Sequence, residues 1–485
     1  MRHWGLFGMG FGRRGRRSGL LLSVLTGVLV AAAVAGCSWW LLWTLLGVEP
    51  ETPNRLQLTM IALAVTAGVG GAVALVVAYR RQRDLERGRF ADVFGAAAAQ
   101  LGAADVAVRI AGVYAMAGVA DEFSAWGRRQ QCVDVLCAYL RLPYAPDAGD
   151  NHLVSRTERR EEDGAAVERV YHYRQNDRPV RATIARVIAD RLRQTAETSW
   201  SDCDFDFTGA VFEDADFRFA TFGGRDTRFA DAVFLGTDTT SFEGARFLGK
   251  RITFRGATFR GRAASFQRAV FRPAVVDRSE RGGSVTSFVD TTFACPVAFD
   301  EAVFAGARTT FERATFTGDR TGFADASFAA ALTTFGRAVF DGDRVCFAGA
   351  EFTGARIAFT ATHFYARGTS FDGCALGERP RWRTGGTTDI DFTDAEYHGA
   401  VSFADAVFEA RTVLFTGGDF FGEISFRRSG LHAREVRFDR PRAWVGTHFD
   451  WDEVPAAKPD NVKPEPWPPT PVERPTKAAD QPTQG

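Results

Sequence analysis

Histidine is the side chain best suited to acid–base chemistry or metal binding near neutral pH, and this chain has few of them. The seven histidines are His3, His152, His172, His363, His398, His432 and His448. No two of them have metal-ligand spacing on one expected helix or strand. Tyr171, His172 and Tyr173 form a local cluster that could suggest a site, and we interpret it as a loop or packing group. We therefore predict no catalytic, cofactor-binding or metal-binding residues.

Other patterns that can signal chemistry have simpler explanations. The stretch from Gly10 to Gly15 matches the G-x-G-x-x-G pattern of dinucleotide-binding loops, but no expected strand precedes it. Carboxylates such as Glu213, Asp214 and Asp216 occupy expected outward positions and are interpreted as solvated charges. The sequence contains no nucleophile elbow, phosphate loop or zinc-protease motif. We predict that the protein is not an enzyme and needs no cofactor.

The cysteines are few and irregularly spaced, which predicts free thiols in a reducing compartment. They are Cys37, Cys132, Cys137, Cys203, Cys295, Cys346 and Cys374, and no two form a C-x-x-C pair. Cys374 stands two residues before Leu376, in a position expected to point inward. Cys346 precedes Phe347 and is expected to point outward, with no assigned role.

Phenylalanine recurs periodically through the second half of the chain. From Phe207 to Phe371 the steps between Phe residues alternate between about 5 and about 7, which makes a repeat of about 12 residues. A small or β-branched residue stands two positions before most of them, as Ala338 does before Phe340. Residues two apart in an extended chain point to the same side. Each unit therefore sends one large and one small side chain inward.

Short faces separated by turns predict a coil rather than a flat sheet. About four faces close one square coil of about 24 residues, so residues 205–440 would form about ten stacked coils. These residues resemble the pentapeptide-repeat family, which has a small residue two before a central Leu or Phe and folds as a right-handed quadrilateral β-helix. Phe replaces the commoner Leu here, and the period is not uniform. Arg272–Ser287 and Gly377–Asp391 break the period and are expected to be surface loops.

Two long apolar segments precede the repeat. Residues 19–46 and residues 56–79 each exceed the roughly 20 residues that a helix needs to cross a bilayer. Arginines occur in the leader, residues 1–18, and after the second segment. The positive-inside rule then predicts a transmembrane hairpin with residues 47–55 as its external loop and both termini in the cytoplasm. The expected location is the cell membrane; a lipoprotein cleavage box at Val34–Cys37 leaves lipidation as an alternative.

The sequence of residues 80–200 indicates an α-helical module, which we expect on the cytoplasmic side of the membrane. Helical spacing of apolar residues recurs in the segments Phe90–Leu101, Val106–Val119, Cys132–Leu142 and Val180–Arg193. The polar stretch Pro146–Asp177 between them is expected to be a loop. The helical string resembles the module found upstream of pentapeptide repeats in actinobacterial membrane proteins. The β-helix is expected over residues 201–440, and the Pro-rich residues 441–485 are expected to be a disordered tail.

The charge balance narrows the class of function. Residues 205–440 hold about 31 acidic and about 29 basic side chains, whereas a rod that mimics DNA needs a strong acidic excess. Nucleic acid is therefore not expected as a partner. We favour a membrane-anchored, non-enzymatic scaffold or protein-interaction module with an unidentified protein partner. The alternatives are a membrane-proximal sensor or regulator that binds a ligand in the helical module and, least favoured, a DNA-mimicking topoisomerase inhibitor.

Overall fold

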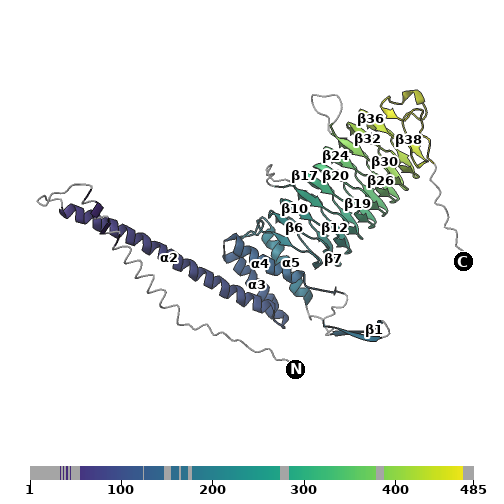
Figure 1. Cartoon of the computed structure of the whole chain (residues 1–485). Helices are drawn as coiled ribbons and strands as arrows, with labels where there is room; N and C mark the ends of the chain where they lie inside the picture. The colour runs from purple at the N-terminus through teal and green to yellow at the C-terminus, as the bar shows by residue number, and fades with distance from the viewer. Residues whose placement is uncertain are drawn as a thin grey trace, which may run out of the picture. The chain divides into compact units, whose positions relative to one another are not determined.

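The computed structural model describes residues 33, 36–37, 40–41, 44, 55–123, 125–146, 155–162, 165–172, 177–273, 283–377 and 387–472. The chain divides into two compact units, residues 1–93 and residues 94–485. Figure 1 shows a long helix, a group of shorter helices and a stack of short strands.

Helix α2 (Arg55–Leu101) contains the second predicted membrane segment, residues 56–79. Several apolar side chains in this part of α2 are exposed, Leu63 and Leu75 among them. Among the described residues, no helix combines the length and apolarity that crossing a membrane requires. Most of residues 19–46 lie outside the described part of the chain. The structure thus gives no support to the predicted transmembrane hairpin.

Three shorter helices form the helical module: α3 (Val106–Glu122), α4 (Trp126–Leu140) and α5 (Asp177–Leu192). The Asp105 carboxylate caps α3 by accepting a hydrogen bond of 2.7 Å from the backbone N–H of Ala107. Many of the apolar residues at helical spacing are buried, among them Val113, Met116, Leu136, Ile184 and Ile188, whereas Tyr114 is exposed. The helices therefore pack by the stripes that the sequence pattern indicates.

The polar stretch between α4 and α5 contains a β-hairpin, where a loop was predicted. Strands β1 (Ser155–Glu162) and β2 (Ala165–His172) pair antiparallel. The register sets Glu158 opposite Arg169 and Arg159 opposite Glu168. Opposite charges directly across a strand pair are favourable. The sequence lacks the apolar alternation that usually marks a strand, because these cross-strand pairs are ionic.

From Phe205 onward the chain winds into about ten coils whose strands pair in parallel, one coil on the next, as predicted (Figure 1). One sheet, the β4–β37 sheet, consists of β4 (Val211–Glu213), β7 (Val233–Leu235), β11 (Thr258–Phe259), β15 (Thr292–Phe293), β18 (Thr315–Phe316), β21 (Val339–Phe340), β25 (His363–Phe364), β29 (Glu396–Tyr397), β33 (Asp419–Phe420) and β37 (Ala443–Trp444). A second, the β8–β38 sheet, consists of β8 (Thr239–Ser241), β12 (Ala263–Ser265), β16 (Val297–Ala298), β19 (Arg320–Gly322), β22 (Arg344–Cys346), β26 (Gly368–Ser370), β30 (Ala400–Ser402), β34 (Ile424–Ser425) and β38 (Thr447–His448).

The third sheet has 18 strands and covers the other two faces of the coil, so we term it the corner sheet. Strands β17 and β20, each of 8 residues, run around the corner and join the two faces. Its members are β3 (Phe205–Asp206), β5 (Thr221–Phe222), β6 (Asp226–Arg228), β9 (Arg246–Phe247), β10 (Arg251–Thr253), β13 (Val270–Phe271), β14 (Val285–Ser287), β17 (Val303–Thr310), β20 (Ser327–Thr334), β23 (Glu351–Phe352), β24 (Arg356–Ala358), β27 (Ala375–Gly377), β28 (Asp389–Asp391), β31 (Val407–Glu409), β32 (Thr412–Leu414), β35 (Gly430–Leu431), β36 (Glu435–Arg437) and β39 (Val462–Lys463).

The phenylalanines form the core of the coil stack in four columns. Within a column, rings of successive coils lie parallel; the Phe311 and Phe335 ring centroids are 4.8 Å apart with an interplanar angle of 2°. Between columns, rings meet edge to face, as Phe311 and Phe323 do at 5.7 Å and 88°. Both are favourable aromatic geometries. The prediction that the periodic Phe residues point inward is confirmed, because these rings are buried.

Tight turns after two of the four columns hold the corners. The backbone N–H of Ala314 donates to the carbonyl of Phe311 at 3.0 Å, and Arg313 between them has a φ of 54°. Asp325 and Arg337 occupy the same turn position with φ of 54° and 57°. Such left-handed backbone is unfavourable for residues other than glycine. The left-handed conformation is nevertheless adopted here, because the Phe before each turn and the Ala after it both point into the core.

The two predicted interruptions of the period fall at the same corner of the coil. Each lies between a strand carrying a buried aromatic or Leu residue and the next strand of the corner sheet, β13 to β14 and β27 to β28. Parallel pairing nevertheless continues across both, since Arg251 is in register with Val285 and Arg356 with Asp389. Extra residues at a corner leave the coil geometry intact. Residues 274–282 and 378–386 lie outside the described residues.

Much of the predicted disordered tail is an ordered cap. Besides β37, β38 and β39, residues 441–472 contain the 3-10 helix η2 (Pro455–Ala457). Trp467 packs edge to face on Phe438, Phe449 and Trp444 at 5.7, 5.2 and 5.5 Å. Val462 extends the stack by pairing with Val436. The last Phe rings would otherwise be exposed to water, and the tryptophans cover them. Residues 473–485 lie outside the described residues.

Candidate functional site

A cluster of histidine and aromatic side chains lies on the outer face of the β4–β37 sheet. Phe364 and Tyr397 point into the core, so the residues on either side of them point outward. The register sets His363 beside Glu396, and the residues that follow these strands place Tyr365 and His398 next to them. With Phe421, we term these five residues, listed here together, the histidine–aromatic cluster: His363, Tyr365, Glu396, His398 and Phe421.

Glu396 is the centre of this cluster. Its Oε2 atom accepts a hydrogen bond of 2.9 Å from the Tyr365 hydroxyl and lies 3.0 Å from Nδ1 of His363. Nε2 of His398 is 3.7 Å from the same oxygen, and Nη1 of Arg442 is 3.6 Å from Oε1. Burial opposes ionisation of Glu396, but the hydrogen bonds from Tyr365 and His363 outweigh it and lower the pKa of this carboxyl. Burial and the neighbouring Glu396 raise the pKa of Tyr365.

The geometry of the cluster is poorly suited to proton transfer. A carboxylate that is held ionised and hydrogen-bonded is a poor general base, because its pKa moves away from neutral pH. The rings of Tyr365 and His398 are 4.8 Å apart, and those of His398 and Phe421 are 5.4 Å apart. Tyr365 and Phe421 are 40% and 49% exposed. Within the described residues, no group of three or more His, Cys, Asp or Glu could hold a metal ion.

The sequence pattern alone does not reveal this cluster, because His363 and Glu396 are far apart in the chain. The usable signal is the coil register. Phe364 and Tyr397 occupy the same aromatic column, with ring centroids 5.4 Å apart. Their preceding residues must therefore be neighbours once the insertion before β28 is discounted.

A second polar group is buried inside the helical module. The Asp177 carboxylate accepts hydrogen bonds from Nη1 of Arg109 at 2.7 Å, from Nε of Arg181 at 2.6 Å and from the Tyr139 hydroxyl at 2.6 Å. Arg109, Asp177 and Arg181 are 1%, 6% and 5% exposed. Buried charges are tolerated when they are paired in this way. Since the four residues come from α3, α4 and α5, the network fixes the three helices to one another.

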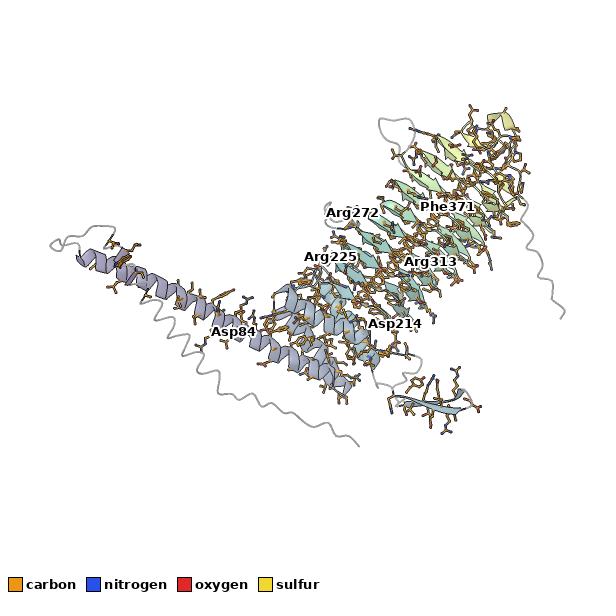
Figure 2. All side chains as sticks on the ribbon, viewed as in Figure 1. Asp84, Asp214, Arg225, Arg272, Arg313 and Phe371 are labelled. Atoms are coloured by element: carbon orange, nitrogen blue, oxygen red, sulfur yellow. The ribbon has the colours of Figure 1, made fainter. Side chains whose placement is uncertain are left out.

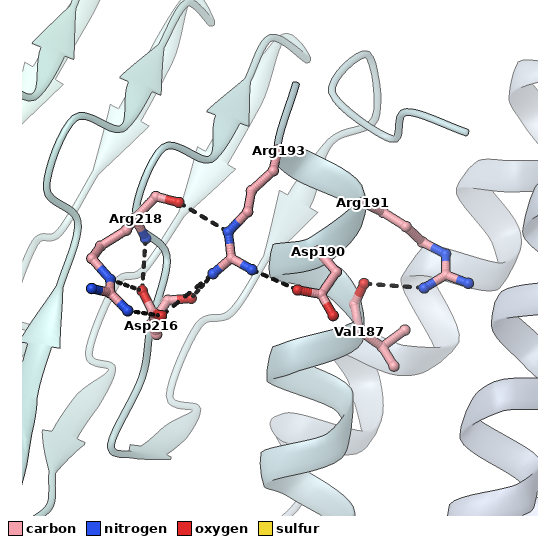
Figure 3. Close-up of polar contacts among 6 residues, drawn as sticks. All are labelled: Val187, Asp190, Arg191, Arg193, Asp216 and Arg218. Atoms are coloured by element: carbon pink, nitrogen blue, oxygen red, sulfur yellow. Dashed lines mark hydrogen bonds and ion pairs between the residues drawn. The ribbon is translucent and has the colours of Figure 1, made fainter. Parts of the chain in front are cut away.

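The helical module also binds the first coil through charged contacts. Arg141 of the α4 end forms an ion pair of 2.7 Å with Asp206, and Arg178 of α5 forms one of 3.1 Å with Glu213. Figure 3 shows Arg193, which follows α5, between Asp190 and Asp216; its ion-pair distances to the two carboxylates are 2.6 and 3.4 Å. The first-coil carboxylates interpreted as solvated charges, Glu213, Asp214 and Asp216, therefore lie at an interface.

Two grooves flank these elements. One of about 550 Å³ lies between α5 and the first coil and is lined by both signs of charge, including Arg186, Asp190 and Asp214. The other, of about 410 Å³, runs over the β8–β38 sheet and is lined mainly by small residues such as Ser370 and Ser402. Ser425 and His448 also line this second groove, and among the described residues no hydrogen bond joins their side chains.

The remaining predicted groups are not brought into a catalytic arrangement. His172 and Tyr171 lie on β2, opposite Ser155 and Arg156, and Tyr173 lies outside the described residues. All seven cysteines are free thiols, as predicted. Cys374 is buried and donates to the carbonyl of Phe347, and burial raises its pKa to about 12. Cys346 points outward, as predicted, and lines the groove over the β8–β38 sheet.

No family model matches the chain, and the searches of curated proteins and of solved structures return no match. The repeat β-solenoid therefore rests on the residues and the coil geometry themselves.

Proposed function

We propose that this protein is a non-enzymatic scaffold or protein-interaction module built on a pentapeptide-repeat-like β-solenoid. One observation carries the proposal. The coil stack is capped at both ends, by the helical module and by the tryptophans of residues 441–472, so that its free surface is a set of regular lateral faces. Such extended surfaces are what repeat proteins use to bind partners. The histidine–aromatic cluster is the first contact surface that we assign.

The proposal includes anchoring at the cytoplasmic face of a cell membrane. It draws on the two apolar segments of the sequence, residues 19–46 and 56–79, and on the exposed apolar side chains of α2. Uncovered apolar surface of this kind favours a nonpolar environment. The measurement is carbonate extraction of cell membranes that contain the full chain. Release of the chain into the carbonate supernatant would contradict the anchor and leave the interaction role untouched.

The interaction role is tested by photocrosslinking in cells with a photoreactive residue at position 365 or, as a control, at position 343. Asp343 is exposed and directly precedes β22 of the β8–β38 sheet. We expect protein adducts at position 365 that position 343 does not give. Identical adduct patterns at both positions, or adducts only between copies of the chain, would contradict a partner surface at the cluster.

A sensor or regulator remains the second candidate, and a specific observation supports it. The Asp177 network joins three helices, and the ends of two of them, α4 and α5, carry ion pairs to the first coil. A ligand that displaces one of these two helices would therefore also strain that interface. Thermal-shift screening of the full chain would detect such a ligand. The DNA-mimic alternative is weakened by pairing of surface carboxylates with arginines, such as Asp290 with Arg313 at 2.6 Å.

A further inference from the structure

Charge is distributed unevenly along the coil stack. Between residues 217 and 273, Lys and Arg outnumber Asp and Glu by eleven to four. Over residues 283–377 and 387–440 the acidic residues outnumber the basic ones by twenty to thirteen. The acidic residues of the first coil offset little of this excess, because Asp206 and Glu213 pair with Arg141 and Arg178 of the helical module. Of the eleven cations, Arg218 pairs with a first-coil acid, Asp216, at 2.8 Å. The early coils therefore carry a local positive field.

The cations concentrate on one part of the corner sheet, over β6, β9, β10, β13, β14 and β17. Arg251 is in register with Val285, and Val285 with Arg308, so these arginines extend from one row of outward positions. Arg225 and Arg272 occupy the corner itself, and Figure 2 shows them along one edge of the stack. We term the following six residues the basic face: Arg225, Arg246, Lys250, Arg251, Arg272 and Arg308.

Three members of the basic face, Arg246, Arg272 and Arg308, have no acidic partner among the residues that the structure describes. Arg246, Arg272 and Arg308 are exposed. In the part of the chain that the structure describes, none of these three side chains forms an ion pair or a hydrogen bond. The nearest acid in register, Asp226, is shared between Arg251 and Arg228, the latter at 3.0 Å. Uncompensated cations at this spacing attract an anionic partner.

The chemistry of the surrounding face indicates which anion. On the described strands, none of the residues in register with Arg246, Arg251 and Arg308 is aromatic; they are Thr221, Asp226, Val270, Val285 and Leu332. Single-stranded nucleic acids usually bind where bases can stack on aromatic side chains, and duplex reading needs an element that enters a groove. An anionic lipid surface instead presents a plane of phosphate groups, and each nearby Lys or Arg contributes to its attraction.

We propose that the basic face docks on an anionic lipid surface through the phosphate groups of the lipids. This proposal rests on the membrane anchoring proposed above, because an anchor keeps the face within reach of a bilayer. The acidic coils that follow would be repelled by the same surface. Docking would therefore hold the early coils against the leaflet and direct the histidine–aromatic cluster, on later coils, toward the cytoplasm.

The test uses the full chain inserted into nanodiscs of phosphatidylcholine, which leave the basic face unoccupied. These are mixed with vesicles of phosphatidylcholine with or without phosphatidylglycerol, and flotation measures capture. We expect capture only by vesicles that contain phosphatidylglycerol. Capture should be lost as ionic strength rises from about 0.1 M to about 1 M, since the screening length falls from about 10 Å to about 3 Å.

Two charge-reversal variants of equal formal charge separate the face from net charge. R246E/R272E/R308E should weaken capture at least about tenfold, since each cation near an anionic leaflet is worth roughly a factor of five. R320E/R344E/R367E places the same changes at exposed arginines on or beside the β8–β38 sheet and should bind like the wild type. Thermal melting checks that both variants fold. If the first does not, R246K/R272K/R308K should retain capture, because lipid attraction needs charge more than guanidinium geometry.

Several results would overturn the proposal. They are capture that does not depend on phosphatidylglycerol, equal loss in both charge-reversal variants, loss in the lysine variant, or insensitivity to salt. Binding of a DNA oligonucleotide through Arg246, Arg272 and Arg308 more tightly than vesicles would assign the face to nucleic acid instead. Carbonate extraction tests the membrane anchor separately. If it shows that the chain is not anchored, the same capture assay is run on the chain without nanodiscs. Failure of the anchor and failure of lipid docking can then be told apart.

Discussion

Replacing Phe316 by alanine should be among the most damaging single changes in the coil stack. Phe316 is 1% exposed, and its ring lies between those of Phe293 at 4.9 Å and Phe340 at 4.7 Å. It also meets Phe323 edge to face at 6.1 Å. Truncation of a buried Phe to Ala typically costs about 3–5 kcal/mol.

The geometry places this variant at the upper end of that range. Backbone pairing of β18 with β15 and β21 fixes the spacing of the coils, so the neighbouring rings cannot close the cavity. The lost aromatic contacts add roughly 0.5–1.5 kcal/mol for each pair. We therefore expect a loss of about 4–5 kcal/mol in the free energy of unfolding, before any local relaxation.

Urea denaturation of the full chain, followed by circular dichroism, measures the loss. Phe219→Ala is the control, because Phe219 also lies in the coil stack but at an outward turn position, where it is 58% exposed. Its truncation should cost less than about 1 kcal/mol, as is usual for surface changes. The reasoning would be refuted if Phe316→Ala unfolded at the wild-type urea concentration, or if both variants lost equal stability.

Four further predictions test other parts of the structure. Thr333→Val should stabilise the chain by about 1 kcal/mol, because the buried Thr333 hydroxyl has no hydrogen-bond partner among the described residues. Thr362→Val should instead destabilise it, because it removes the 2.9 Å hydrogen bond from the Thr362 hydroxyl to the carbonyl of Phe335. The two variants should therefore shift the melting temperature in opposite directions. Arg337→Gly should gain roughly 0.5–1 kcal/mol by relieving the φ of 57°, and a lower melting temperature would contradict it. Asp177→Asn should lower the free energy of unfolding by about 3–5 kcal/mol, because it leaves Arg109 and Arg181 buried without their carboxylate. Asp190→Asn, which breaks a surface ion pair, should lower it by less than about 1 kcal/mol in the same urea titration. Because the pKa of Glu396 is lowered in the folded state, its contribution to stability is present above its unfolded pKa and is lost as pH falls through its folded pKa. Glu396→Gln should therefore weaken the fall of melting temperature with falling pH. An unchanged pH dependence would refute the assignment.

The solenoid could be predicted because its signal is local and repeated. An inward Phe with a small residue two positions before it needs no knowledge of distant contacts, since alternation is a property of extended backbone. Both interruptions of the period were also predictable, because the sequence lacks Phe there at the positions that the period requires. The ordered cap was not, since a Pro-rich composition gives no sign that Trp467 has three aromatic rings to cover. The β1–β2 hairpin was missed because β1 consists of charged and polar residues and shows no apolar alternation.

The sequence by itself therefore determined which side chains face the core and that the chain winds into coils of regular length, because both follow from a short period along the backbone. Only the tertiary structure decided which outward residues meet. His363 reaches Glu396, and Arg251 aligns with Arg308, through the register of stacked coils and the residues inserted at one corner. The physical reason is that backbone pairing between coils is indifferent to outward side chains. Their neighbours are therefore set by coil length rather than by any pattern of their own.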